Sequence, residues 1–147
     1  MQSQDIARKA LNKPVVSLFR ALRAVAVLYD GEFPAGGPGS TQFTLLAILN
    51  DHGAMTATQL GQALAMDRSA LKRDLAFLAR RGLIKQSSTS GRDSRRWRLT
   101  RAGHRDLARL RTYWERAQTR LMRIVGKTDW KMLHSILDRV TQAAGES

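Results

Sequence analysis

Four side chains between positions 68 and 73 carry groups that bind nucleic acids: Arg68, Ser69, Lys72 and Arg73. In a helix, positions 69, 72 and 73 share one side because they are spaced at i, i+3 and i+4. Arginine can hold guanine O6 and N7 with two hydrogen bonds, whereas serine and lysine more often bind phosphate or a less selective base edge. The pattern predicts a helix that enters a DNA major groove. The alternative is a basic helix face that contacts only water.

Two further groups of side chains flank this segment. Thr58 and Gln59 stand at the start of a preceding short helical pattern, where free backbone N–H groups suit a phosphate. Arg92, Arg95 and Arg96 lie in a Ser/Gly/Arg-rich segment between two short apolar stretches. These arginines are predicted to reach the minor groove or its phosphates. Together with the first four residues, they form the predicted DNA-binding set.

The charge of the chain is concentrated in the same region. The sequence has 25 Lys and Arg against 12 Asp and Glu, a net charge of +13 over 147 residues. Between residues 68 and 116, fifteen basic residues stand against four acidic ones, a local net charge of +11. Such an excess on the segment that would dock is typical of phosphate binding. A uniformly basic, solvated surface is the alternative.

Other classes of protein find little support in the sequence. There is no cysteine, which excludes disulfides and thiolate metal sites, and the three histidines stand far apart. No apolar run approaches the roughly 20 residues of a membrane span, and the charged N-terminus has no secretory apolar region. No phosphate-cradling loop, nucleophile elbow or carboxylate pair is present. We expect a cytoplasmic protein that is not an enzyme and needs no cofactor or metal.

Helical spacing of apolar residues positions the predicted DNA-binding residues. It occurs in six stretches, near residues 14–29, 40–51, 56–64, 67–82, 100–126 and 128–140. Short strands are expected at 83–84 and 97–99. The predicted helix caps are Ser40 or Thr41, Thr56 with Gln59, Asp67, Thr100, and Thr128 or Asp129. This order predicts a mainly α fold with a small β-hairpin wing, a winged helix-turn-helix over residues 40–103.

The flanking residues 1–39 and 104–147 are predicted to form a helical dimerisation region. Their apolar residues recur with alternating spacings of three and four, as in helices that pack on other helices. A two-fold dimer gains by binding two half-sites about one helical turn apart. Terminal helices that pack only on their own subunit are the alternative. The predicted interface residues are Leu18, Leu22, Leu110, Leu121, Leu133 and Leu137.

Several segments resemble the MarR family of bacterial transcription regulators. They are TQFTLLAIL from residue 41, MTATQLGQALAMDRSALKRDLAFLARRGLI from residue 55, LTRAG from residue 99 and YWERAQ from residue 113. The resemblance covers roughly residues 18–125 and implies a homodimer with one winged helix per subunit. One departure is plain, since Asp93 and Arg95 form the family's Asp-x-Arg motif only seven residues before Thr100. The family usually has nine, which implies a tightened or shifted wing.

The resemblance also implies regulation by a small molecule. Many MarR-type proteins repress transcription and are released by aromatic or phenolic compounds bound where the reading domain meets the dimer helices. Tyr29, Phe43, Tyr113 and Trp114 are the candidate pocket residues, with ordinary core positions as the alternative. We therefore expect a repressor that binds double-stranded DNA at a pseudo-palindromic operator as a homodimer. The rival readings are a non-specific, architectural nucleic-acid-binding protein and a protein-interaction adaptor.

Overall fold

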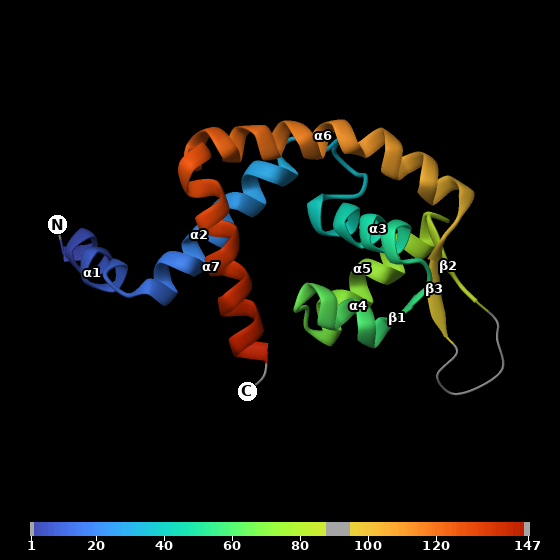
Figure 1. Cartoon of the computed structure of the whole chain (residues 1–147), viewed down its shortest axis with the longest axis horizontal. Helices are drawn as coiled ribbons and strands as arrows, with labels where there is room; N and C mark the ends of the chain where they lie inside the picture. The colour runs from blue at the N-terminus through green and yellow to red at the C-terminus, as the bar shows by residue number, and fades with distance from the viewer. Residues whose placement is uncertain (1, 88–94, 146–147) are drawn as a thin grey trace.

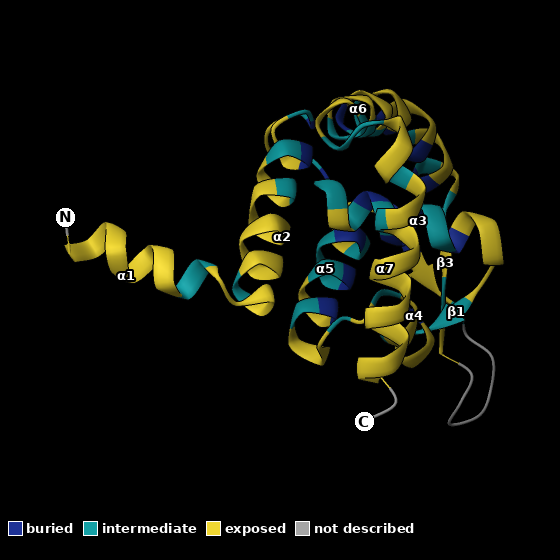
Figure 2. Cartoon of the chain, turned by 60° about the vertical axis from the view of Figure 1, so that its left-hand side comes forward, coloured by how far each residue is buried: buried dark blue, intermediate teal, exposed yellow. Residues whose placement is uncertain are grey.

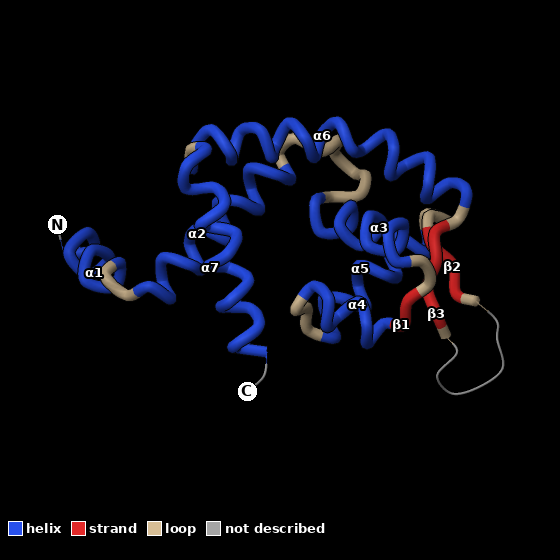
Figure 3. Tube along the Cα trace, viewed as in Figure 1, coloured by secondary structure: helices blue, strands red, loops and turns tan. Residues whose placement is uncertain are grey.

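The computed structural model describes residues 2–87 and 95–145, and its centre is a winged helix (Figure 1). In chain order this unit contains α3 (Ser40–His52), β1 (Met55–Thr56), α4 (Ala57–Leu64), α5 (Arg68–Arg80), β2 (Ile84–Gln86) and β3 (Arg96–Leu99). The strands form one antiparallel sheet in the order β1-β3-β2. Figure 3 shows this sheet at one end of an otherwise helical molecule. The predicted fold class is confirmed.

The sheet has one strand that the sequence did not predict. In β1, Met55 pairs with Trp97 and Thr56 pairs with Arg96. The pairing joins residues about forty positions apart, so no local pattern indicates it. Because β1 leads directly into α4, it fixes the base of the wing against the start of the helix-turn-helix.

Local hydrogen bonds begin three of the helices where the sequence predicted. Thr56 and Gln59 form a reciprocal cap at α4, with N–H donors at 3.1 Å from Thr56 Oγ1 and 2.9 Å from Gln59 Oε1. The Asp67 carboxylate accepts the Ala70 N–H at 2.8 Å and begins α5. Thr100 Oγ1 accepts the N–H of residue 103 at 3.0 Å and begins α6 (Arg101–Val125). These three caps are confirmed.

Two other predicted caps are wrong. Helix α3 begins at Ser40 itself, and Gly39 is its N-cap because the Gln42 side chain accepts the Gly39 N–H. The Ser40 side chain instead donates to the Asp30 carboxylate, across the preceding loop. Helix α7 (Lys127–Gly145) begins before the predicted Thr128 or Asp129.

The core lies where α3, α5 and the first half of α6 meet. Leu45, Leu46, Leu60, Leu78 and Leu110 are its fully buried large apolar side chains. Leu110 was predicted to lie in the dimer interface, and that prediction is wrong. The regular apolar spacing of α6 continues along the helix, but its first half packs on its own subunit's core.

The remaining helices extend away from this core. They are α1 (Gln2–Leu11), α2 (Pro14–Asp30) and α7, and neither α1 nor α7 contains a buried residue (Figure 2). Large apolar side chains are exposed along α2 and α7: Val15, Leu18, Phe19, Leu22, Val27, Met132, Ile136, Leu137 and Val140. None of the helices within residues 2–87 and 95–145 is long and apolar enough to cross a bilayer.

Candidate nucleic-acid interface and adjoining pocket

Helix α5 separates an apolar side from a cationic side. Leu71, Leu75 and Leu78 face the core, and Leu78 is fully buried. Arg68, Ser69, Lys72 and Arg73 are all exposed, and the last three border one surface hollow. Among the described residues, no ion pair involves Arg68, Lys72 or Arg73, so no carboxylate holds these cations. The structure thus brings the four predicted residues together on an accessible helix.

The start of α4 adjoins this cationic helix. Thr58 is exposed and lines a second hollow together with Arg68, Lys72 and Trp97. Gln59 is also exposed, but its side-chain oxygen accepts the N–H of the α4 cap. Only the amide NH2 of Gln59 is therefore available as a donor to DNA.

The wing carries further exposed arginines. Arg95 and Arg96 are exposed, and Arg96 pairs with Thr56 of β1. The backbone carbonyl of Arg96 accepts the Ser87 N–H at 2.8 Å, so this end of the hairpin is closed by a strand-type hydrogen bond. Arg92, predicted as a third wing contact, lies outside the described residues, as does Asp93.

A pocket of about 440 Å³ lies between α2, the first turn of α3 and α6. Of the four predicted aromatic residues, Tyr29 and Trp114 line it, with ring centroids 4.8 Å apart in an edge-to-face contact. Phe43 does not line the pocket, because its ring stacks on Trp114 with the centroids 5.0 Å apart. Burial disfavours the charged phenolate of Tyr29 and raises the pKa of its hydroxyl group.

Tyr113 was also predicted to line the pocket and does not. Its ring lies 6.3 Å from that of Phe33, which in turn lies 5.8 Å from Phe43. Phe33 was missed because it stands in a Gly/Pro-rich loop, where apolar spacing carries no helical signal. The aromatic side chains therefore form one cluster, of which only one edge faces the pocket.

Two of the predicted interface leucines also belong to this pocket. Leu22 and Leu121 line it, although the Leu22 side chain is 69% exposed in the single chain. Leu18 and Leu137 are exposed on α2 and α7, and Leu133 is half-buried.

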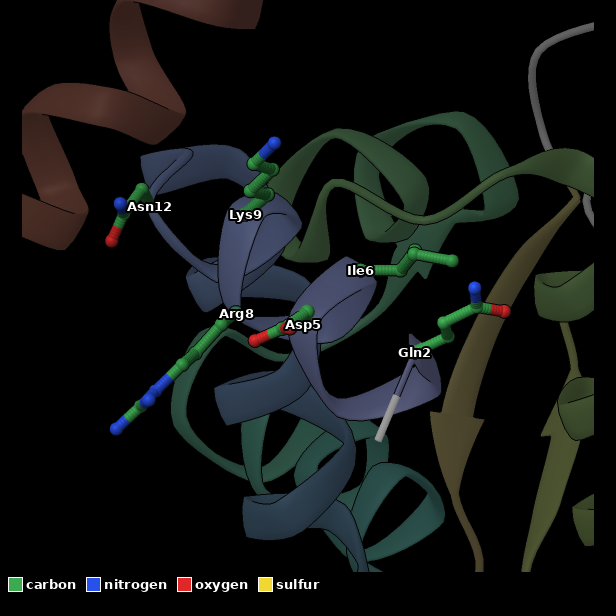
Figure 4. A pocket seen from close by; sticks show the side chains of 6 residues that line it. All are labelled: Gln2, Asp5, Ile6, Arg8, Lys9 and Asn12. Atoms are coloured by element: carbon green, nitrogen blue, oxygen red, sulfur yellow. The ribbon is translucent and has the colours of Figure 1, made fainter.

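Another hollow, of about 810 Å³, lies along α1 and is lined only by residues 2–12 (Figure 4). Because a single helix and its following turn form it, that hollow is open surface.

No metal site is evident in residues 2–87 and 95–145, where no three His, Asp or Glu side chains gather closely enough to hold an ion.

Residues 40–95, which include the helix-turn-helix, match the model of the MarR family. Over these residues the chain is similar to the MarR family. A search of curated proteins found no match to this chain.

Several solved structures with the same fold are transcriptional regulators. Mycobacterium tuberculosis MosR, in a complex with DNA, is 26% identical, with a TM-score of 0.79 over 90% of this chain and 96% of MosR. Streptomyces coelicolor PcaV, with its natural ligand, is 24% identical, with a TM-score of 0.78 over 91% of this chain and 95% of PcaV. Bordetella bronchiseptica BpsR, whose DNA binding 6-hydroxynicotinic acid regulates, is 18% identical, with a TM-score of 0.78 over 89% of this chain and 95% of BpsR.

Proposed function

We propose that this protein is a MarR-type, sequence-specific repressor that binds a pseudo-palindromic DNA operator as a homodimer in the cytoplasm. The observation that carries the proposal is the exposed cationic side of α5, where Arg68, Lys72 and Arg73 form no ion pair with any carboxylate of residues 2–87 and 95–145. Arg95 and Arg96 are exposed on the wing. A helix of this kind reads base edges, and the wing arginines bind the flanking backbone or minor groove. The complex of MosR with DNA supports this use of the fold.

Residues 40–103 are the proposed DNA-binding region, and residues 1–39 and 104–147 the dimerisation region. The exposed apolar side chains of α2 and α7 support the second assignment, because a subunit rarely leaves so many large apolar groups in water. Leu18, Leu133 and Leu137 remain proposed interface residues. Leu110 is excluded by its burial in the subunit core, and Leu22 and Leu121 lie at the border of interface and pocket.

The proposed effector is a small aromatic or phenolic molecule bound in the 440 Å³ pocket. Tyr29 and Trp114 offer ring faces and edges for stacking. The hydroxyl oxygens of Ser40, Thr41 and Thr44 can accept hydrogen bonds, although those of Ser40 and Thr44 already donate to Asp30 and to the Ser40 carbonyl. This combination of apolar walls and a few polar groups is typical of small-molecule sites. The ligand-bound PcaV structure and the regulation of BpsR by 6-hydroxynicotinic acid support the assignment.

Binding selection from a random duplex library tests the proposed function. The dissociation constants for the selected site, a random duplex and an RNA of equal length are then compared at two salt concentrations. A sequence-specific regulator keeps a preference of about 10³-fold or more at physiological salt. Replacement of Arg73 by Ala should reduce this preference, whereas Arg111→Ala, at an exposed position on the outer part of α6, serves as the matched control. Equal affinity for all three nucleic acids would instead support the architectural alternative.

A further inference from the structure

We propose that Gln42 couples the pocket to DNA binding by holding helix α5 through Asp74 and releasing it when the pocket is filled. Gln42 is a positioning residue here, because it acts on DNA through another element. The inference rests on the proposed function, since it concerns how the same pocket regulates the same DNA-binding helix.

A single side-chain amide joins two helices. Gln42 Oε1 accepts the Gly39 N–H at 2.8 Å, and Gln42 Nε2 donates to Asp74 Oδ1 at 3.1 Å. The first bond caps α3, and the second reaches the middle of α5, next to Arg73. Because the amide group is planar and both ends are used, a shift of the α3 start relative to α5 breaks one of these bonds.

The same turn of α3 forms a wall of the pocket. Ser40, Thr41 and Thr44 line the pocket, whereas Gln42 borders the hollow on the cationic side of α5. The first turn of α3 thus separates the proposed effector from the proposed DNA-binding face. A molecule that occupies the pocket presses on this turn, and packed elements respond to such pressure by shifting between discrete arrangements.

Helix α2 is connected to the same turn. Asp30, the last residue of α2, accepts hydrogen bonds at Oδ1 from the Ser40 N–H at 2.9 Å and the Ser40 hydroxyl at 2.6 Å. A continuous chain of hydrogen-bonded groups therefore runs from α2 through the start of α3 to Asp74. Movement of α2, whose residues also line the pocket, is transmitted along it.

A second contact attaches α5 to the loop between α2 and α3. The Arg81 guanidinium donates to the carbonyl of Gly36 and lies over the ring of Phe77, 4.9 Å from its centroid. This contact restrains the C-terminal end of α5, whereas Gln42 restrains its middle. Loss of the Gln42 bond therefore removes the polar restraint on the middle of α5, while its leucines stay packed in the core and its Arg81 end stays held.

A competing route through the pocket bypasses Gln42. Leu64 and Met66 also line the pocket, and Met66 directly precedes Asp67, the N-cap of α5. A ligand that acts only on this segment changes DNA binding equally with or without Gln42. The experiment below distinguishes the two routes.

The first arm of the test exchanges the bonding groups. Q42E retains an oxygen for the Gly39 N–H but places a carboxylate oxygen against Asp74, and operator affinity should fall about tenfold. D74N keeps an acceptor for Gln42 and should remain within about threefold of wild type. The double variant Q42E/D74N restores a donor–acceptor pair with the groups reversed, so affinity should return to within about threefold. Failure of the double variant to recover affinity, with all proteins folded by circular dichroism, overturns the proposal.

The second arm fills the pocket without a ligand. Ala26 lines the pocket from α2, so Ala26→Trp mimics an occupied pocket, whereas Ala24→Trp places the same group on α2 outside the lining. Ala26→Trp should weaken operator binding about tenfold in the wild-type background and add less than about twofold in a Q42M background. A full additional tenfold loss in Q42M, or no loss in wild type, overturns the coupling role of Gln42.

The two arms separate this inference from the proposed function. If wild-type protein shows no sequence preference, the proposed function itself fails. If it shows that preference but Ala26→Trp acts independently of Gln42, only the coupling role fails. Unfolding midpoints of all variants, measured at one protein concentration, identify any loss that comes from stability alone.

Discussion

Replacement of Gly103 by Ala should disconnect α6 from the base of the wing. A Cβ atom at position 103 would lie 2.1 Å from the Leu83 carbonyl oxygen, where real Cβ contacts stay beyond 3.0 Å. The two groups must therefore separate by at least 0.9 Å, the difference of these distances. The Leu83 oxygen also accepts the Thr100 N–H at 3.0 Å, and the Thr100 hydroxyl donates to the Gly82 carbonyl at 2.5 Å. The required shift strains or breaks these bonds.

The cost can be worked from these contacts. Overpacking of this kind costs about 1–3 kcal/mol, and a weakened hydrogen bond adds about 0.5–1.5 kcal/mol. The higher helix propensity of alanine returns up to about 1 kcal/mol, so the middle of each range gives a net loss of about 2–3 kcal/mol. For a chain of this length, the unfolding midpoint should fall by about 4–12 °C.

Gly61→Ala is the matched control, because a Cβ there meets Leu71 Cδ2 at 3.4 Å and the Met66 carbonyl oxygen at 3.6 Å, without a contact under 3.0 Å. Position 61 lies inside α4, so this substitution should stabilise the protein by up to about 1 kcal/mol. Thermal and urea unfolding of both variants, followed by circular dichroism at one protein concentration, measure the difference. The steric argument is refuted if Gly103→Ala is as stable as wild type or behaves like Gly61→Ala.

Three further predictions concern DNA contacts, assembly and alkaline stability. Arg73→Ala should cost about 1–3 kcal/mol of operator-binding free energy and relax the preference at one base step. Arg95→Ala should weaken binding to most sequences and reduce the slope of log affinity against log salt concentration by about one per wing. Equal, sequence-independent losses from both would contradict base readout by α5. Leu137→Glu, at an exposed position, should leave the subunit folded but monomeric in sedimentation, and a stable dimer would show that α7 lies outside the interface. Burial raises the pKa of Tyr29 above 10.0, so stability present at neutral pH should decline as pH rises past 10. Tyr29→Phe should reduce that decline, as measured by urea unfolding at alkaline pH. If the free energy of unfolding falls with pH as steeply as in wild type, other groups cause the decline.

The sequence determined those features that depend only on contacts between residues a few positions apart. The caps at Thr56, Asp67 and Thr100 each bond a backbone N–H three residues away, so residue type and spacing are sufficient to predict them. The exposed face of α5 follows in the same way, because the buried spacing of Leu71 and Leu75 leaves only one side for the cations. The winged-helix order could therefore be predicted before any tertiary contact was known.

Tertiary structure decided which partner each apolar or polar group meets. The regular spacing of α6 predicts a face that packs but does not specify its partner, and Leu110 proved to lie in its own subunit's core. Strand β1 depends on a pairing of Met55 with Trp97, and the link from Gln42 to Asp74 joins residues 32 positions apart. Such contacts form only after the intervening chain has folded back, and their loop-closure cost is repaid by burial and hydrogen bonds that no local pattern contains. For the same reason, local patterns could not predict that Tyr29 and Trp114 line the pocket whereas Phe43 and Tyr113 do not.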